Sequence, residues 1–251
     1  MSTVPPNDVA IRQFFYSLIG LKNNGTIVDV GCGDGYDLRE IAKALPSDAR
    51  LVGLTLDGNT IEAAKASTDG DERFRFVAAD AANGLPLESN SADVIISKNF
   101  IECITDKDAL LREFHRVLKP GGQIICAHYD WDSQIMDGDD KELVRKIVHA
   151  FGDLKQGWMN DCDAWIGRRL WRTFERTRLF EGSIHAKVLT ETEFVPGTYG
   201  YESINSYETL VRRGIIEQND YNRFISSIKK LAAEGEYLYS ITMYVYCGRK
   251  R

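Results

Sequence analysis

The 251-residue sequence predicts an α/β fold, a doubly wound and mostly parallel sheet with helices on both faces and inserted helices that form a cap. Two observations carry this prediction. From residue 27 onward, short apolar runs alternate with amphipathic stretches, a pattern typical of strand–helix–strand units in a parallel sheet. The apolar runs are nearly continuous, as expected for strands that helices cover on both faces.

The first half of the chain contains five expected strands and three expected helices. Runs of aliphatic and β-branched residues indicate strands, and apolar residues at three- and four-residue spacing indicate helices. The last of these helices is expected to end at the Lys-Pro-Gly-Gly sequence of residues 119–122, because proline and glycine terminate helices. The expected strands are 26–30, 51–54, 74–78, 94–97 and 123–127, and the expected helices are 37–45, 60–67 and 107–117.

Flanking segments are expected to complete a single domain over residues 1–251. Apolar residues at helical spacing predict an N-terminal lid helix within 1–25. The pattern changes after residue 131, where helices and loops replace the regular alternation. A helical cap is expected over 132–178 and 191–235, with two helices in 203–234, and closing strands are expected in 179–190 and 236–251.

Composition limits the classes of function. The net charge of −6 divides into −10 over residues 1–140 and +4 over residues 141–251. An acidic N-terminal half is a poor surface for a phosphate backbone, so no nucleic-acid substrate is expected. The sequence has no apolar run of membrane-spanning length and no secretory signal pattern, so a cytoplasmic protein without a membrane partner is expected.

The five cysteines are scattered and form no Cys-x-x-Cys pair. A disulfide framework and a zinc site are therefore not expected. We expect reduced thiols that are packed in the interior. No metal is expected in the site.

A glycine-rich turn directly follows the first expected strand. It reads Asp29-Val-Gly31-Cys-Gly33-Asp-Gly35 and opens a helix. Glycines permit a tight turn and a close approach of the backbone to a ligand, and the helix N-terminus offers unpaired N–H groups. Dinucleotide enzymes use the spacing G-x-G-x-x-G, whereas this turn is G-x-G-x-G after an acidic residue. The spacing therefore disfavours a nicotinamide oxidoreductase.

The sequence VDVGCGDGYDL resembles the first motif of class I S-adenosylmethionine-dependent methyltransferases, of the quinone-biosynthesis, small-molecule type. Four later stretches resemble this family in order and spacing: VGLTLD, FVAADAANGLPL, ADVIISKNFIECITD and FHRVLKPGGQIICAHYDW. The matches span residues 26–131, and the resemblance implies that these residues form a cofactor-binding core. It implies a Rossmann-like sheet of seven strands whose last strand is antiparallel. It also implies S-adenosylmethionine as cofactor and S-adenosylhomocysteine as product.

The resemblance implies roles for individual residues around the cofactor. The three glycines would lie under the methionine part and the ribose, Asp29 would attract the ammonium, and Asp80 would accept from the adenine amine. The implied cofactor-binding residues are Asp29, Gly31, Gly33, Gly35, Thr55, Leu56, Asp80, Ala81, Ser97 and Lys98.

Two of these positions, Thr55 and Asp80, also have explanations that involve no ligand. Many family members have an acidic residue at the position of Thr55, so the ribose would here lack a bidentate carboxylate. A β-branched residue near a strand also needs no ligand to explain it. Asp80 is equally suited to capping the loop that follows the third strand.

The acceptor side is expected after the fifth strand, because ligands bind at the carboxyl ends of strands in open α/β sheets. His128 and Asp130 are the candidate catalytic residues, since either is able to take or orient a proton. The alternative is that Asp130 caps the next helix. The candidate substrate-binding residues are Tyr16, Asn99, Tyr129, Trp131 and Trp158.

These observations predict a methyltransferase that acts on an oxygen, nitrogen or carbon nucleophile of a small molecule, as a monomer or homodimer. Methyl transfer requires chiefly that the two reactants be positioned and water excluded. Two alternatives remain, a nucleic-acid or protein methyltransferase and a protein that binds S-adenosylmethionine without catalysis.

Overall fold

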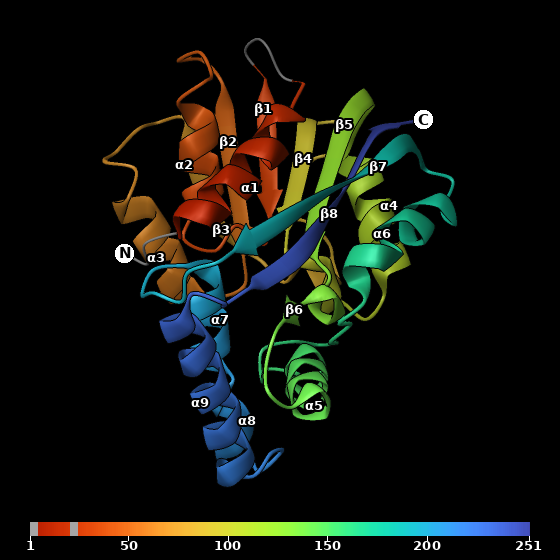
Figure 1. The fold of residues 1–251 in the computed structure, drawn as a ribbon. Coiled ribbons are helices and arrows are strands. Elements are labelled where there is room, and N and C mark those ends of the chain that lie inside the picture. The colour runs from red at the N-terminus through yellow and green to blue at the C-terminus, as the bar shows by residue number, and fades with distance from the viewer. Residues whose placement is uncertain (1–4, 21–24) are drawn as a thin grey trace.

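A computed structural model describes residues 5–20 and 25–251 and contains a twisted sheet with helices on both faces (Figure 1). Residues 1–4 and 21–24 of the expected lid segment lie outside the described ranges. The strands are β1 (Thr26–Val30), β2 (Arg50–Thr55), β3 (Phe74–Ala78), β4 (Ala92–Lys98), β5 (Leu118–Tyr129), β6 (Ile135–Met136), β7 (Phe180–Glu191) and β8 (Tyr239–Lys250).

The sheet has the strand order β3-β2-β1-β4-β5-β8-β6, with β7 paired along β8. The pairs among β1 to β5 are parallel, and β8 is antiparallel to β5, β6 and β7. The α/β class and the antiparallel last strand are therefore confirmed. The sheet has eight strands where seven were expected, because the two-residue β6 pairs with Tyr239 and Ser240 at the start of β8.

The helices are α1 (Pro6–Ser17), α2 (Tyr36–Ala42), α3 (Gly58–Ala66), α4 (Lys107–Val117), α5 (Lys141–Gly152), α6 (Ile166–Glu175), α7 (Tyr199–Ser206), α8 (Glu208–Arg212) and α9 (Gln218–Glu234). Short 3₁₀ turns follow three strands: η1 (Ala81–Asn83), η2 (Ile101–Cys103) and η3 (Trp131–Ser133). Figure 1 shows α5, α8 and α9 projecting from one end of the sheet, while α1 lies across its front.

The core has two parts because successive strand residues point to opposite faces of the sheet. Ile27 of β1 packs in a buried cluster with residues of α1, α2 and α3, among them Phe15. The next residue, Val28, packs in a second cluster with residues of α4 and α6, among them Leu111 and Ile166. Apolar residues at consecutive strand positions are thus all buried, which explains the nearly continuous apolar runs.

The structure differs from the sequence prediction at β5 and in the cap. Helix α4 ends at Val117 as expected, but β5 already begins at Leu118 and includes the Lys-Pro-Gly-Gly segment. Gly121 has a φ of +71°, and the register with β4 shifts between Ala92 and Val94, so a bulge accommodates the proline and glycines. The cap has three helices rather than two in its C-terminal part, because one tightened turn at the buried Tyr207 separates α7 from α8.

We predict that Gly53→Ala destabilises the protein by about 1–3 kcal/mol, because overpacking a close contact forces neighbouring atoms apart. A Cβ atom on Gly53 would lie 2.6 Å from the Phe76 ring and 2.8 Å from Cys32 Sγ. Urea denaturation measures the difference. Gly58→Ala is the matched control, since a Cβ there meets no atom within 4 Å. Equal unfolding midpoints for the two variants would contradict this packing of β2 against β3.

Candidate active site

The glycine loop lies over the end of β2, because the Gly31 and Cys32 N–H groups both donate to the Leu54 carbonyl, at 2.8 and 3.0 Å. Its three glycines have positive φ, which favours glycine over other residues. A Cβ on Gly33 would meet no atom within 4 Å, whereas a Cβ on Gly31 would lie 2.6 Å from the Phe100 ring. Gly33 is therefore the glycine that faces open space.

A hollow of about 220 Å³ opens beside this loop, and we call it the loop pocket. It is formed by the carboxyl ends of β1 to β4, which parallel pairing brings to one edge of the sheet. Eight residues that the sequence analysis proposed for the cofactor or the acceptor line it: Gly31, Gly33, Thr55, Leu56, Asp80, Ala81, Asn99 and Trp158. Sequence reasoning missed other lining residues, among them Phe100 and Asn160.

Two apolar side chains of the loop pocket are unusually exposed. Leu56 is 59% exposed and Trp158 is 61% exposed. Trp158 comes from the segment between α5 and α6, so the cap contributes to this pocket as well as the core. Large apolar side chains exposed in a hollow indicate a site for a ligand with an apolar face.

Asp80 lies at the rim of the loop pocket and caps η1. Its carboxylate accepts hydrogen bonds from the Ala82 N–H at 3.0 Å and from Asn83 Nδ2 at 2.8 Å. The capping role that the sequence left open is therefore present. A carboxylate has about four acceptor sites, so these two bonds leave it further capacity toward the pocket.

Gly35 has a packing role instead of a place in the loop pocket. A Cβ on Gly35 would lie 2.8 Å from the Phe76 ring, which also contacts Gly53. Gly35 begins α2 with a φ of 76°. The close contact and the turn account for this glycine without a ligand.

A buried charged cluster lies behind the glycine loop. Burial and the neighbouring Asp37 raise the pKa of Asp29 well above its usual range, while Lys98 and Arg12 oppose this shift. Burial also lowers the pKa of Lys98, an effect that Asp37 offsets. For Asp37 itself, Lys98 and Arg12 outweigh burial and lower the pKa. The cluster thus holds mutually dependent charges of both signs.

Helix α1 contributes to this cluster through side chains spaced four residues apart. Arg12 donates to Asp8 and to Asp37, each at 2.6 Å, and Tyr16 donates to Asp37 at 2.5 Å. The sequence analysis named Tyr16 only as a candidate substrate-binding residue. The four-residue spacing of Asp8, Arg12 and Tyr16 places them on one helix face, and this signal could have identified all three.

Ser97 and Lys98, proposed for the methionine end, do not line the loop pocket. The buried Ser97 hydroxyl donates to the Val30 carbonyl at 2.8 Å and braces β4 against β1.

A second hollow, of about 610 Å³, lies between α1, α7 and the end of β5, and we call it the cap pocket. Its aromatic lining residues are Trp131, Phe151 and Tyr199, and its polar ones include Asp8 and Arg12. Tyr129 connects the two pockets. Its N–H donates to Asn99 Oδ1 at 3.1 Å and its hydroxyl to Asp8 Oδ1 at 2.7 Å.

Glu102 supports the wall of the cap pocket from behind. Its Oε2 accepts from Trp131 Nε1 at 2.7 Å, and the side chain is almost fully buried. Burial raises the pKa of Glu102 to about 7. Sequence reasoning did not include Glu102 among the site residues, because only the folded chain brings it under Trp131.

His128 lies beside Glu102 and lines neither pocket. It is 1% exposed, and burial lowers its pKa to about 4. Nδ1 lies 2.7 Å from the Tyr129 carbonyl, and Nε2 lies 3.6 Å from Glu102 Oε1. The structure therefore places His128 behind the pocket wall, not at the acceptor side as the sequence suggested.

Asp130 also differs from its expected placement. Its side chain is fully buried and faces α6, where the Arg168 N–H donates to Oδ2 at 3.0 Å and Arg168 Nε at 2.6 Å. Arg168 Nη2 donates to the other oxygen. A bidentate pair with arginine occupies both oxygens, so the geometry favours a structural role that fixes the start of α6 at the end of β5.

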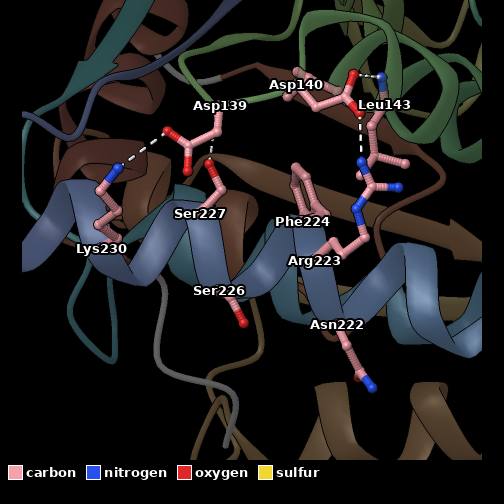
Figure 2. A pocket seen from close by; sticks show the side chains of 10 residues that line it. Asp139, Asp140, Leu143, Asn222, Arg223, Phe224, Ser226, Ser227 and Lys230 are labelled. Carbon is pink, nitrogen blue, oxygen red and sulfur yellow. Dashed lines mark hydrogen bonds and ion pairs between the residues drawn. The ribbon is translucent and has the colours of Figure 1, made fainter.

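A third hollow, of about 430 Å³, lies between α5 and α9 (Figure 2). Its charged lining residues pair with one another: Lys230 with Asp139 at 3.3 Å and Arg223 with Asp140 at 2.7 Å. Because these charges are satisfied internally and the strand ends contribute nothing here, the geometry offers no comparable ligand site.

Within residues 5–20 and 25–251, no group of three His, Cys, Asp or Glu side chains is arranged to hold a metal ion. In the same ranges, no helix has both the length and the apolar content to cross a membrane.

Comparisons with known proteins agree with this geometry. Residues 21–182 match the family model described as a methyltransferase domain. The demethylmenaquinone methyltransferase of Staphylococcus epidermidis is 31% identical over 115 residues, which are 46% of this chain and 47% of that protein. The chain spans less than half the length of the curated relatives it matches.

Solved structures share the fold. A protein of Bacillus halodurans superposes with a TM-score of 0.62 and 16% identity, over 96% of this chain and 99% of that chain. A geranyl diphosphate methyltransferase in complex with S-adenosylmethionine superposes with a TM-score of 0.55 and 15% identity, over 96% of this chain and 85% of that chain. At these identities the similarity concerns the fold.

We predict that Asp130→Ala destabilises the protein by on the order of 2 kcal/mol, because it removes the buried partner of Arg168. Arg168 is partly exposed and regains water, which limits the loss. Urea denaturation provides the measurement. In the control Asp132→Ala, the lost partner is the exposed Trp165, so a change within about 0.5 kcal/mol is expected. An Asp130→Ala variant as stable as the parent would mean that the ion pair does not hold α6.

Proposed function

The chain belongs to the methyltransferase domain family, and on this basis we propose that it transfers a methyl group from S-adenosylmethionine to a small-molecule acceptor. The observation that carries the proposal is the loop pocket. Its open side at Gly33, at the carboxyl ends of four parallel strands, provides room for a ligand against the glycine loop. In this proposal the core, residues 26–131, binds most of the cofactor, and the lid and cap segments form most of the acceptor site.

The loop pocket suits the adenosine part of the cofactor. Leu56 and Trp158 expose apolar surface there that the faces of a flat base would cover. Asp80 retains acceptor capacity for an exocyclic amine, with the Ala81 backbone beside it, and Thr55 lies at the end of β2 for the ribose. These residues fit the proposed ligand in shape and in hydrogen bonding.

The methionine part would lie toward the charged cluster behind Gly31 and Gly33. This cluster contains three carboxylates, Asp8, Asp29 and Asp37, and two cations, Arg12 and Lys98. S-adenosylmethionine carries a sulfonium, an ammonium and a carboxylate. Burial and Asp37 raise the pKa of Asp29 although Lys98 and Arg12 oppose the shift, and the ammonium of a bound ligand would further favour the ionised carboxylate.

When bound, S-adenosylmethionine supplies an electrophilic methyl group on its sulfonium. The chain's contribution is to position the acceptor and exclude water. We assign the acceptor to the cap pocket, with Trp131 in its wall and with Tyr129 and Asn99 between the two pockets. Tyr16, which the sequence suggested for the substrate, lines neither pocket and donates to Asp37 instead. His128 and Asp130 lie behind this wall, so we propose that they support it and do not contact the acceptor.

Small-molecule methylation agrees with the acidic N-terminal half and with the aromatic side chains that line the cap pocket. Incubation of the protein with S-adenosylmethionine and fractionated small-molecule extracts tests it by mass spectrometry. The expected result is a product whose mass exceeds that of its acceptor by one methylene group, together with S-adenosylhomocysteine. Product only with nucleic-acid or protein fractions would overturn the substrate class. Binding of S-adenosylmethionine without any product would indicate a non-catalytic binding protein.

We predict that Gly33→Val weakens S-adenosylmethionine binding by at least about 2 kcal/mol, because the side chain occupies the space where the ligand must lie. Isothermal titration calorimetry measures the affinity, with NAD as the comparison ligand. Gly70→Val is the matched control. Gly70 also has a positive φ, of 76° against 52° for Gly33, and a Cβ there likewise meets no atom within 4 Å. Gly70 lines neither pocket. A folded Gly33→Val variant with the parent affinity would refute the placement of the ligand.

We predict that Asp80→Ala lowers S-adenosylmethionine affinity by about 1–3 kcal/mol, the contribution of a polar contact to an otherwise unsatisfied group. Loss of the η1 cap costs about 1 kcal/mol of stability as well. Calorimetry and thermal unfolding separate the two effects. If only the melting temperature falls and the affinity is kept, Asp80 is a cap and does not contact the ligand.

A further inference from the structure

Two buried side chains behind the cap pocket, Glu102 and His128, connect Trp131 to the Tyr129 carbonyl through contacts that the proposed mechanism does not use. Trp131 Nε1 donates to Glu102 Oε2 at 2.7 Å. The other oxygen of Glu102 lies 3.6 Å from His128 Nε2, and His128 Nδ1 lies 2.7 Å from the Tyr129 carbonyl. The atom His128 Nε2 is buried and has no hydrogen-bond partner.

The groups at the two ends of this chain of contacts, the Trp131 indole and the Tyr129 carbonyl, determine which atom donates and which accepts in each contact. An indole N–H only donates, and a carbonyl oxygen only accepts. The hydrogen of a neutral His128 must therefore be on Nδ1, so Nε2 is an acceptor. This unprotonated nitrogen faces Glu102 Oε1, which is also an acceptor when the carboxyl is ionised.

One proton resolves the conflict between these two acceptors. A hydrogen on Glu102 Oε1 donates to His128 Nε2 and draws the 3.6 Å gap toward hydrogen-bond length. Each group then has a partner, in the order Trp131, Glu102, His128 and the Tyr129 carbonyl. Without that proton a buried carboxylate faces a buried lone pair, which costs free energy that no neighbour offsets by hydrogen bonding.

We propose that Glu102 and His128 share one proton at neutral pH, and that this uncharged pair positions Trp131 in the wall of the cap pocket. The pair consists of positioning residues, and their effect on the acceptor rests on the proposed function of that pocket. The shared proton itself does not depend on any ligand.

The charged groups around the pair leave this arrangement intact. Asp163 and Lys107 act on both residues, and Lys98 acts on His128. Lys107 is already bound to Asp161 at 3.0 Å and Asp163 to Arg169 at 2.6 Å. Among the described residues, the direct hydrogen-bond contacts of the pair are the neutral Trp131 indole and the Tyr129 carbonyl.

The packing of Trp131 shows why its position depends on this support. The indole ring meets His128 edge-on, with ring centroids 6.4 Å apart, and meets Phe151 edge-on at 6.5 Å. Phe151 and Trp131 both line the cap pocket. A change in the Glu102–His128 contact therefore acts directly on the shape of the pocket.

The shared proton gives a pH dependence opposite to that of a free catalytic histidine, which would gain a positive charge below about pH 6.5. A buried pair that holds one proton is unchanged at mildly acidic pH and ionises as the pH rises through about 7. The pKa of Glu102 is raised, so its protonated form stabilises the fold at low pH, and this stabilisation is lost as the pH rises toward 7.

Nuclear magnetic resonance of the intact, ligand-free chain, labelled with ¹⁵N-histidine and ¹³C-glutamate, tests the proposal directly. His128→Gln and Glu102→Gln variants identify the signals. The expected result is a neutral His128 with its hydrogen on Nδ1 from pH 5.5 to 8, and a Glu102 carboxyl that stays protonated at pH 6. A hydrogen on Nε2, an imidazolium at pH 6, or a Glu102 carboxylate ionised at pH 6 would each overturn the proposal.

Glu102→Gln and Glu102→Ala form a matched pair of variants. Glutamine offers an oxygen to Trp131 and an N–H to His128 at every pH, so it mimics the protonated acid, whereas alanine offers neither. Glu102→Gln should keep the Trp131 indole N–H resonance of the parent, and Glu102→Ala should shift it. The melting temperature of the parent relative to Glu102→Gln should fall as the pH rises from 5 to 8.

A pH-independent difference between the parent and Glu102→Gln would contradict the shared proton. If Glu102→Ala does not fold, the glutamine variant and the parent spectra still decide the question. Calorimetry with S-adenosylmethionine is run on the same samples. A failure to bind S-adenosylmethionine would refute the proposed function while leaving the histidine and glutamate spectra to decide this proposal.

Discussion

Parallel pairing in fixed register is the constraint on which the rest of this structure depends. Asp29 of β1 pairs with Gly53 of β2 on one side and Ile96 of β4 on the other, and Gly53 pairs in turn with Phe76 of β3. This register brings four strand ends to a single edge and seats the glycine loop on the Leu54 carbonyl. The loop pocket exists because all four strands end there.

The end of β5 shows how strand geometry separates residues that are adjacent in the sequence. Residues 128–131 combine a histidine, a carboxylate and two aromatic rings, and this composition suggested one acceptor site. Successive side chains of a strand point to opposite faces. Asp130 turns to α6 and pairs with Arg168, while the Tyr129 hydroxyl reaches Asp8 on α1. The four residues therefore connect the sheet to different elements instead of converging on one ligand.

Electrostatics couples the lid helix to the core. Asp8, Arg12 and Tyr16 occur at four-residue intervals on α1, and the last two converge on Asp37 at the start of α2. Asp8 also accepts from Tyr129, at the boundary between the two pockets. The position of α1 thus depends on buried charges behind the glycine loop. A cation that binds beside Asp29 would change the balance of charge in the same cluster, and this cluster includes Arg12 of α1.

The sequence by itself determined the fold class, the five strands of the core, the glycine loop and most residues of the loop pocket. Local periodicity and glycine spacing encode these features, because each depends on residues close together in the chain. The tertiary structure alone decided which of the remaining candidate side chains are held away from a cavity. Gly35 packs on Phe76, Asp130 is held by Arg168, and Glu102 lies under Trp131, although these partners are 29 to 41 positions apart. Such contacts arise from strand pairing and helix packing, which no local pattern records.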